Sequence, residues 1–276
     1  MDKHHEKILE IMIEVDKICR KNNIKYYMLG GTMLGAYRHK GFIPWDDDAD
    51  IGIFNDDYEL FLKKAEIELK ENFIVRNIKK ENVPYSFTHI ENKNTTCIEQ
   101  NRSATGYSGG VYIEIFPLHG CSENIFLREY LYMKIKFLKK ILFTLILDIN
   151  SKRRGVIKSF IIKINRKIFK SETIIRQIIN TLNKNKISKS KYICNLLGHW
   201  ERKETFYKNI FGNGKEYEFE GYKFYGVEKP EEYLKQMYGK DFMLPPSEEK
   251  IKLMKHPHLI LNLDIPYNKY KKDKNV

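Results

Sequence analysis

Residues 29–53 read LGGTMLGAYRHKGFIPWDDDADIGI, and this stretch decides the fold of the first half of the chain. A short apolar run over residues 25–29 predicts a buried strand that stops at the glycine pair. Thr32 is placed to cap a helix over residues 33–39. Residues 49–54 then alternate in polarity and predict a second strand. Strand, glycine turn, helix and strand together indicate a mixed α/β unit with a small sheet.

Four aspartates crowd into the end of this stretch, at Asp46, Asp47, Asp48 and Asp50. Carboxylates this close repel one another and raise one another's pKa, so the cluster costs stability unless a cation lies among them. A solvated acidic loop and a metal site are the two interpretations. Because alternate side chains of a strand share a face, Asp48 and Asp50 are expected to point the same way and to bind an oxygen-ligand cation such as Mg²⁺.

The glycine turn before the acidic cluster favours phosphate binding. Gly30 and Gly31 allow backbone N–H groups to approach a phosphate closely, and the helix that begins after Thr32 adds its positive dipole end. A phosphate cradle beside paired carboxylates is the arrangement that phosphoryl transfer requires. The order and spacing of these parts favour a metal-phosphate site over an acidic surface loop.

A third carboxylate is expected from a neighbouring strand, and Glu114 is the candidate. It lies in residues 111–116, VYIEIF, where a charged residue among apolar neighbours needs a partner. Exposure on an edge strand is the alternative. Arg38 and Lys40 lie between the glycines and the carboxylates, where they are placed to neutralise phosphate charge. Trp45 is expected either to pack the acidic loop down or to cover a base or cationic headgroup of a substrate.

The rest of the chain predicts a small sheet followed by a mainly helical half. Apolar residues at helical spacing predict an opening helix over residues 3–21. The expected fold class is α/β (α+β), a small mixed sheet flanked by helices with a mainly helical C-terminal half. A boundary near residue 122 separates a catalytic core, residues 1–122, from a basic helical region, residues 123–276, packed on it. Further elements are expected as strands at 73–76, 85–90 and 97–99, helices across 124–191, a hairpin at 216–224 and a short helix from Pro230 to Gly239.

Positive charge is concentrated in one segment. The formal net charge is +13, and residues 128–170 hold thirteen Lys or Arg against two acidic residues, a local balance of +11. This block suggests an anionic partner such as nucleic acid, lipid headgroups or a phosphorylated glycan, or else helices with solvated lysines. Its apolar face either lies on an anionic membrane or packs on the rest of the protein. That face consists of Leu131, Ile135, Leu138, Leu142 and Leu145.

Several protein classes are disfavoured by what the sequence lacks. The first residues have no uninterrupted apolar core or cleavage site typical of a signal peptide. No apolar run is long enough to predict a membrane span. The four cysteines form no CxxC pair, which disfavours a zinc finger or a disulfide framework and favours a reducing compartment. A cytoplasmic location is therefore expected, with peripheral contact at the inner membrane face through the basic segment.

The stretch at 29–53 resembles the signature of the LicD family of phosphocholine transferases, members of the nucleotidyltransferase-fold superfamily that are similar to the fukutin-related enzymes. Residues 113–118, IEIFPL, and 238–246, YGKDFMLPP, with His256 downstream, also carry the resemblance. It implies a divalent metal, Mg²⁺ or Mn²⁺, and a phospho-alcohol donor, CDP-choline or another CDP-alcohol. The implied acceptor is a hydroxyl of a cell-surface glycan, such as teichoic acid or lipopolysaccharide, or of its lipid-linked precursor, with release of CMP.

The resemblance also implies which residues act. The catalytic, metal-binding carboxylates map onto Asp48 and Asp50, with Asp46 close enough to help. The third position is usually Asp in the family motif DIFPLD, whereas this chain has Glu114 there and ends the motif with His119. Glu114 is expected to bind metal or to help deprotonate the acceptor. The donor is expected to contact Gly30, Gly31, Thr32, Arg38, Lys40 and Trp45.

Other functions compete with phosphocholine transfer. The same site would serve for ribitol, glycerol or ethanolamine phosphate. The same fold also serves nucleotidyl transfer to RNA or a small molecule, with nucleic acid on the basic segment. The similarity of residues 29–53 to phospho-alcohol transferases argues against that partner. A non-enzymatic glycan- or lipid-binding module is disfavoured by the intact pair Asp48 and Asp50.

Overall fold

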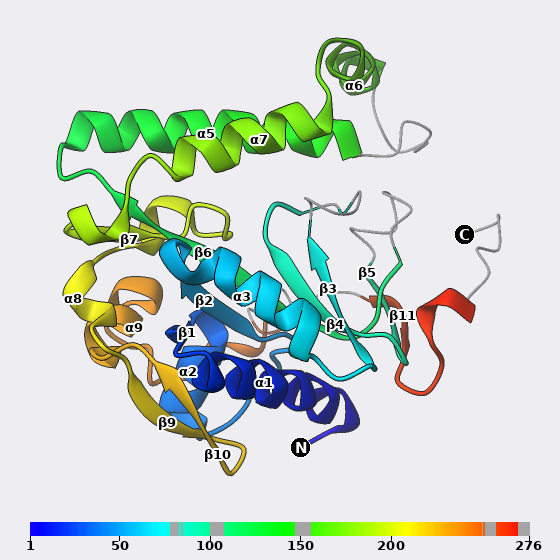
Figure 1. Ribbon diagram of the computed structural model, residues 1–276, viewed down its shortest axis with the longest axis vertical. Helices are drawn as coiled ribbons and strands as arrows, with labels where there is room; N and C mark the ends of the chain where they lie inside the picture. The colour runs from blue at the N-terminus through cyan, green and yellow to red at the C-terminus, as the bar shows by residue number, and fades with distance from the viewer. Residues whose placement is uncertain are drawn as a thin grey trace.

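A computed structural model describes residues 1–77, 83, 85–99, 108–146, 156–249, 251 and 258–269. Its centre is a mixed sheet in the order β1-β2-β6-β4-β3, with β7 beside β6 and β8 beside β7 (Figure 1). β2 and β6 are parallel, and the other described pairs are antiparallel. The strands are β1 (Tyr26–Met28), β2 (Asp50–Phe54), β3 (Phe73–Asn77), β4 (Thr88–Asn92), β6 (Tyr112–Cys121), β7 (Tyr192–Cys194) and β8 (Thr205–Tyr207).

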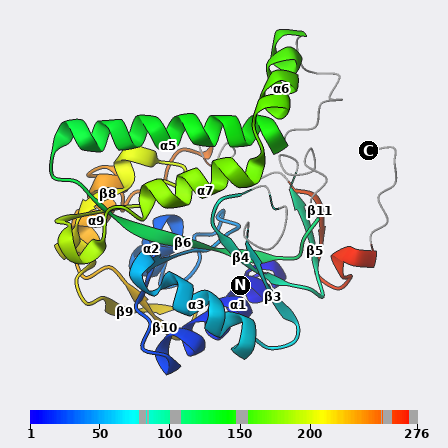
Figure 2. The same ribbon diagram turned by 45° about the horizontal axis from the view of Figure 1, so that its top comes forward.

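Helices cover both faces of this sheet. α1 (Lys3–Lys21) and α3 (Asn55–Glu68) pack together on one face (Figure 2). α2 (Gly30–His39) lies on the other face and contacts β2 and α9 (Pro230–Tyr238). The mixed sheet between helices confirms the expected α+β class.

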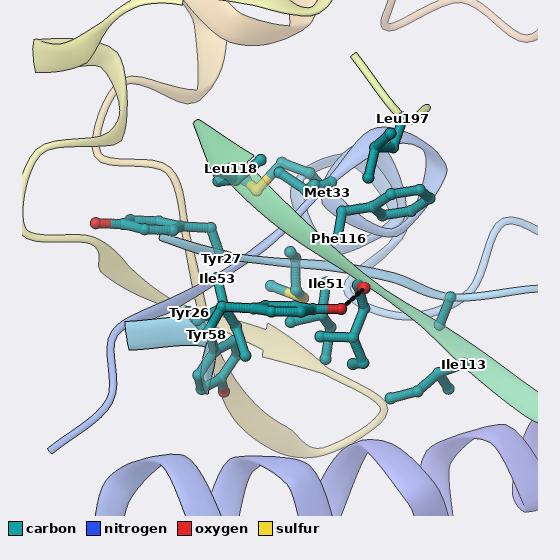
Figure 3. Packing of buried hydrophobic residues seen from close by; sticks show 14 of the residues in the cluster. Tyr26, Tyr27, Met33, Ile51, Ile53, Tyr58, Ile113, Phe116, Leu118 and Leu197 are labelled. Carbon is teal, nitrogen blue, oxygen red and sulfur yellow. Dashed lines mark hydrogen bonds between the residues drawn. The ribbon is translucent and has the colours of Figure 1, made fainter. Parts of the chain in front are cut away.

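The core is centred on the parallel pair β2 and β6. Ile51 and Ile53 of β2 and Ile113 of β6 are completely buried. Tyr27 of β1 and Met33 of α2 join them in the same cluster (Figure 3). Because β2 and β6 each have strands on both sides, the polar residues where the two strands begin are held in fixed positions.

The second half of the chain adds helices and short strands. α5 (Ile125–Ile146) and α7 (Ser171–Leu182) lie side by side, and α6 (Val156–Ile168) packs against α5 (Figures 1 and 2). The central sheet takes β7 and β8 from this half. The other elements are β5 (Thr96–Glu99) paired with β11 (His258–Asn262), the hairpin β9 (Lys215–Phe219) and β10 (Tyr222–Gly226), helix α8 (Lys208–Phe211), and the 3-10 helices η1 (Ile187–Lys189), η2 (Glu201–Glu204) and η3 (Tyr267–Lys269).

Some predicted elements are confirmed and others are wrong in detail. α1 has the predicted bounds, and α9 begins at Pro230 and ends before Gly239. The prediction that Thr32 caps the second helix is wrong, because that helix begins at Gly30 with Leu29 as its N-cap. The strand predicted at 85–90 begins later, at Thr88. β7, β8 and β11 have no counterpart in the prediction.

The predicted apolar face of α5 packs inside the protein. Leu131, Ile135, Leu138 and Leu142 are all buried, and Leu145 is partly buried against the core. α7 lies against α5 and buries Ile174, Ile175 and Ile178 of its own. The packing interpretation of this face is therefore confirmed, and the expectation that this face meets a membrane is wrong.

Two further expectations concern membranes and cysteines. No helix within the described ranges is long and apolar enough to cross a membrane. The four cysteines are all buried, and none of them forms a disulfide. His256 and residues 147–155 of the basic segment lie outside the described residues.

Candidate active site

Asp50 is a half-buried carboxylate of the acidic cluster. It begins β2, and its register partner on β6 is Glu114. Its Oδ1 atom is buried, and among the described residues it has no hydrogen-bond partner. Burial raises the pKa of Asp50 well above its usual value, and the charges of Asp48, Glu114 and Asp46 raise it further. The structure therefore places Asp48, Glu114 and Asp46 within electrostatic reach of Asp50, although Asp48 precedes the strand instead of lying in it.

The two glycines give these carboxylates room. A Cβ atom on Gly30 would lie 2.9 Å from Oδ2 of Asp50, and one on Gly31 would lie 2.2 Å from Oδ2 of Asp46. Gly30 also has a positive φ of +49°, a backbone conformation that residues with a side chain rarely adopt. The glycine pair thus lets the start of α2 pack directly on two acidic side chains.

The start of α2 is tied to both β2 and α9. The hydroxyl of Thr32 accepts a hydrogen bond of 2.8 Å from the N–H of Asp50, which links α2 to β2. The N–H of Gly30 donates to the hydroxyl of Tyr233 at 2.9 Å. The first backbone bond across a turn of the helix runs from Met33 N–H to the Leu29 carbonyl at 3.0 Å. The N–H groups of Gly31 and Thr32 come before this first bond of the helix. N–H groups in this position of a helix have no acceptor within the helix and are those that bind anions.

Two tyrosines of α9 close the site from the side of α2. Tyr233 and Tyr238 are largely buried, and burial raises the pKa of both hydroxyls far above the usual value. The charges of Asp46, Asp48 and Asp50 add to the effect on Tyr238. Tyr238 is the first residue of the YGKDFMLPP segment, which is one of the segments that carry the resemblance to the LicD family. Nothing in the sequence pattern pointed to Tyr233.

Glu114 is held by a buried histidine. His89 of β4 is the register partner of Glu114, and its Nε2 lies 3.3 Å from Oε1 of Glu114. The His89 ring is completely buried and stacks between Tyr85 and Tyr112, with ring centroids 3.7 and 4.2 Å away. Its Nδ1 lies 3.6 Å from Oε1 of Glu91. β6 is paired on both sides, so the alternative that Glu114 lies on an exposed edge strand is wrong.

Glu204 is a carboxylate that sequence reasoning missed. It ends η2 and is buried, with its Oε2 accepting 2.7 Å from Asn195 Nδ2 and its Oε1 accepting 3.0 Å from the Trp200 N–H. Burial raises the pKa of Glu204 to about 7, although these two hydrogen bonds and the charge of Lys139 act in the opposite direction. Its charge also contributes to the raised pKa of Asp50 and of Tyr233.

Arg38 joins the far end of α2 to the YGKDFMLPP segment. Its Nη1 donates to the carbonyls of Phe242 at 2.8 Å and Leu244 at 3.4 Å. The guanidinium carbon lies 5.9 Å from the centre of the Trp45 ring, and Trp45 is half-buried. Arg38 and Trp45 therefore hold the segment before the acidic cluster against the segment after α9.

Lys40 is turned toward a different part of the molecule. Its Nζ lies 3.4 Å from Oε2 of Glu218 on β9, and its side chain is 72% exposed. Lys40 itself adopts the left-handed conformation that ends α2. The structure places this predicted donor-binding residue beside the β9–β10 hairpin, at the end of α2 opposite Gly30.

His119 lies apart from the carboxylates. It stands an odd number of residues from Glu114 along β6, so the two side chains point to opposite faces. His119 is buried, and within the described ranges neither of its ring nitrogens has a hydrogen-bond partner. Burial lowers the pKa of His119 to about 3, which keeps the ring neutral. The acidic position at the end of the family motif is thus replaced here by a neutral core residue.

The carboxylates fit a divalent cation in chemistry. Oxygen ligands from Asp and Glu are those that Mg²⁺ prefers, and the unpartnered Oδ1 of Asp50 is a buried acceptor that a cation would satisfy. A cation would also relieve the repulsion that raises the pKa of Asp50. Among the described residues, no three His, Cys, Asp or Glu side chains converge as a metal cluster. Asp48 and Asp50, with Asp46 and Glu114 nearby, are the residues that would hold it.

Comparison with known proteins agrees with this geometry. Residues 23–146 match the family model described as LicD/FKTN/FKRP, nucleotidyltransferase domain. The chain is 29% identical over 252 residues to the lipopolysaccharide cholinephosphotransferase LicD of Haemophilus influenzae, covering 88% of this chain and 91% of that protein. It is 50% identical over 34 residues to the human ribitol 5-phosphate transferase FKRP, covering 12% of this chain and 7% of that protein. It is also 34% identical over 68 residues to the mouse ribitol-5-phosphate transferase FKTN, covering 23% and 15%. Residues 23–146 contain the glycine turn, the acidic cluster and Glu114, so the chain carries a LicD/FKTN/FKRP nucleotidyltransferase domain.

Proposed function

We propose that the protein transfers phosphocholine from CDP-choline to a hydroxyl of a cell-surface glycan, or of its lipid-linked precursor, and releases CMP. The observation that carries this proposal is the buried, unpartnered oxygen of Asp50 among three other carboxylates at the start of α2. Such a site suits a diphosphate bound with a divalent cation. The long similarity to a lipopolysaccharide cholinephosphotransferase supports choline as the alcohol and a glycan as the acceptor.

The proposed roles follow from the positions of the residues. Mg²⁺ or Mn²⁺ held by Asp48 and Asp50, with Asp46 and Glu114 nearby, would supply positive charge to the donor diphosphate. The N–H groups of Gly31 and Thr32 would bind a phosphate oxygen at the start of α2.

The chemical step exchanges one phosphorus–oxygen bond for another. The acceptor hydroxyl oxygen bonds to the phosphorus that carries choline, and the bond from that phosphorus to the CMP oxygen breaks. Glu114 takes the hydroxyl proton, and the contact with His89 orients its carboxylate for this role. CMP leaves with the electron pair of the broken bond, so the charges and atoms balance.

CMP release from CDP-choline tests the proposal. With Mg²⁺ and a glycan acceptor, we expect the wild type to release CMP, and Asp48→Asn or Asp50→Asn to release almost none. Asp56→Asn is the matched control, because Asp56 is an exposed aspartate on α3. Excess chelator should stop the wild-type reaction, and added Mg²⁺ or Mn²⁺ should restore it. Full activity of Asp48→Asn, or full activity in chelator, would contradict the metal role.

Alternative CDP-linked donors test a second candidate function, the transfer of ribitol phosphate instead of phosphocholine. The identities to the ribitol-phosphate transferases FKRP and FKTN favour CDP-ribitol as the next donor to try. CDP-glycerol and CDP-ethanolamine complete the series, and the donor with the highest kcat/KM identifies the alcohol. Pyrophosphate release from a nucleoside triphosphate, without CMP release from any CDP-alcohol, would instead establish a nucleotidyltransferase.

A further inference from the structure

α5 presents a row of large apolar side chains to solvent on the side opposite its buried face. Phe126, Tyr130, Met133 and Phe137 are 82%, 65%, 58% and 62% exposed. They are spaced by four, three and four residues, so they form one stripe along the helix. Exposed apolar side chains scattered singly are ordinary, but a continuous stripe indicates an interaction surface.

α6 carries a second exposed apolar face and is even less buried than α5. Of its side chains that the structure describes, Ile162 alone is buried. The exposed residues recur at helical spacing and lie on one face of α6, which packs against α5. They are Ile157, Phe160, Ile161, Ile164 and Ile168. We call these five residues and the four of the α5 stripe the α5–α6 surface.

The charges around this surface are positive. α6 contains no acidic residue, and Lys163 and Lys167 are exposed on it. Lys140 is exposed on α5, and in the described part of the chain none of these three lysines makes a hydrogen bond or an ion pair. The acidic Glu129 on α5 is paired with Arg202 at 2.6 Å, which removes it as a competing charge.

A basic cavity adjoins the start of the α5 stripe. It has a volume of about 480 Å³ and is lined by Asn124, just before α5, and by Lys184, Lys186 and Lys189. Glu123, also in the lining, is paired with Lys191 at 2.7 Å. Lysines therefore lie at both ends of the apolar surface, beside α5 and on α6.

We propose that the α5–α6 surface docks on an anionic lipid bilayer. The apolar side chains enter the boundary between headgroups and acyl chains, and the lysines contact the lipid phosphates. Charge complementarity identifies the occupant, because an apolar stripe bordered by unpaired lysines matches a surface that is apolar inside and anionic outside. The proposal does not rest on the proposed function, since none of these residues belongs to the candidate active site.

Vesicle flotation of the full chain tests this proposal. The probes are vesicles of phosphatidylcholine alone and vesicles of equal parts phosphatidylcholine and phosphatidylglycerol. We expect the wild type to float with the anionic vesicles, less in high salt, and to stay unbound with the neutral ones. Replacing Lys140, Lys163 and Lys167 together by Gln should reduce the partition coefficient roughly 100-fold, since each lysine near an anionic surface is worth about one factor of five.

A second variant set separates apolar insertion from charge alone. Phe126→Ser, Phe137→Ser and Phe160→Ser, combined, should abolish flotation, while Ile67→Ser should float like the wild type. Ile67 is the matched control because it is an apolar residue of α3 that is 80% exposed. Wild type that stays unbound with anionic vesicles, or a triple variant that floats as well as the wild type, overturns the proposal. The proposal is also overturned if the wild type does not float but self-associates, and the triple variant loses this self-association. The surface would then bind a second copy of the chain.

Discussion

Replacing Glu204 by Gln should make the protein more stable as the pH rises, relative to the wild type. Glu204 is buried, and burial raises its pKa from 4.5 to about 7. A carboxyl whose pKa is raised in the folded state binds its proton more tightly there than in the unfolded chain. The wild type therefore loses stability as the pH rises between 4.5 and about 7, because the folded protein must then ionise a buried group. Glutamine does not titrate, so the variant escapes this loss.

The size of the effect follows from the pKa difference. One pKa unit corresponds to about 1.4 kcal/mol, so a shift of about 2.5 units gives about 3 kcal/mol above pH 7. At pH 5 the unfolded carboxyl is already mostly ionised, and the penalty there is about 1 kcal/mol. The advantage of Glu204→Gln over the wild type should therefore grow by about 2 to 3 kcal/mol from pH 5 to pH 8. Lost hydrogen bonds to Asn195 or Trp200 shift both values alike and cancel in this difference.

Urea unfolding followed by circular dichroism at pH 5 and pH 8 measures this difference. Glu201→Gln is the control on the same turn, because Glu201 is partly exposed and pairs with Lys136 at 3.0 Å. Burial opposes the ionisation of Glu201, but the hydrogen bond and charge of Lys136 outweigh it and lower the pKa of Glu201. Its variant should show nearly the same stability change at both pH values. A free energy difference between Glu204→Gln and wild type that stays constant from pH 5 to pH 8 would refute the reasoning.

Three further perturbations test the site itself. Asp50→Asn should raise the free energy of unfolding by about 1 to 3 kcal/mol in urea titrations, because it removes a buried, unpartnered charge, and should abolish CMP release. Lower stability would show that Asp50 is satisfied. Gly31→Ala should lower the free energy of unfolding by about 1 to 3 kcal/mol, since its Cβ would lie 2.2 Å from Asp46 Oδ2; an unchanged urea midpoint would place Asp46 elsewhere. Glu114→Gln should lower kcat about 10²- to 10⁴-fold with a smaller change in donor KM, and near-normal kcat would leave Glu114 only a structural role.

The parts of the fold predicted from sequence are those with strong local signals. α1 has an amphipathic repeat along its whole length, and α9 has Pro230 at its start and Gly239 after its end. β7 and β8 have three residues each, which is too short for a periodic pattern to show. The start of α2 was placed too late because Thr32 is a common N-cap residue, whereas here its hydroxyl binds the Asp50 N–H.

Side-chain orientation on α5 shows a second limit of sequence reasoning. Periodicity identified the apolar face of α5 that is buried, but it did not say what covers that face, nor that a second apolar stripe lies on the exposed side. The face of Leu131 and Leu138 is covered by α7, and the face of Phe126 and Phe137 is exposed. The sequence left open whether the predicted face meets a membrane or the rest of the protein, and the packing of α7 against α5 decides between them.

The candidate site was predicted where its residues are close in sequence or belong to a known motif. Glu114 comes from the strand beside β2, as the sequence analysis expected, and the register makes it the partner of Asp50. Glu204 and Tyr233 escaped notice because their role depends on tertiary contacts with residues far earlier in the chain. The roles in metal and donor binding stay predictions until the activity tests are done.

The hydrogen bond between Gly30 and Tyr233 has a consequence for how the protein is made. Its two partners are 203 residues apart, so a ribosome has produced all four clustered carboxylates long before the tyrosine that closes over the start of α2. Contacts between such distant residues form late, because a long loop must first be closed. A nascent chain released before α9 emerges would carry the complete acidic cluster without the Tyr233 contact at the start of α2, so the timing of synthesis itself keeps an unfinished chain from forming the finished site.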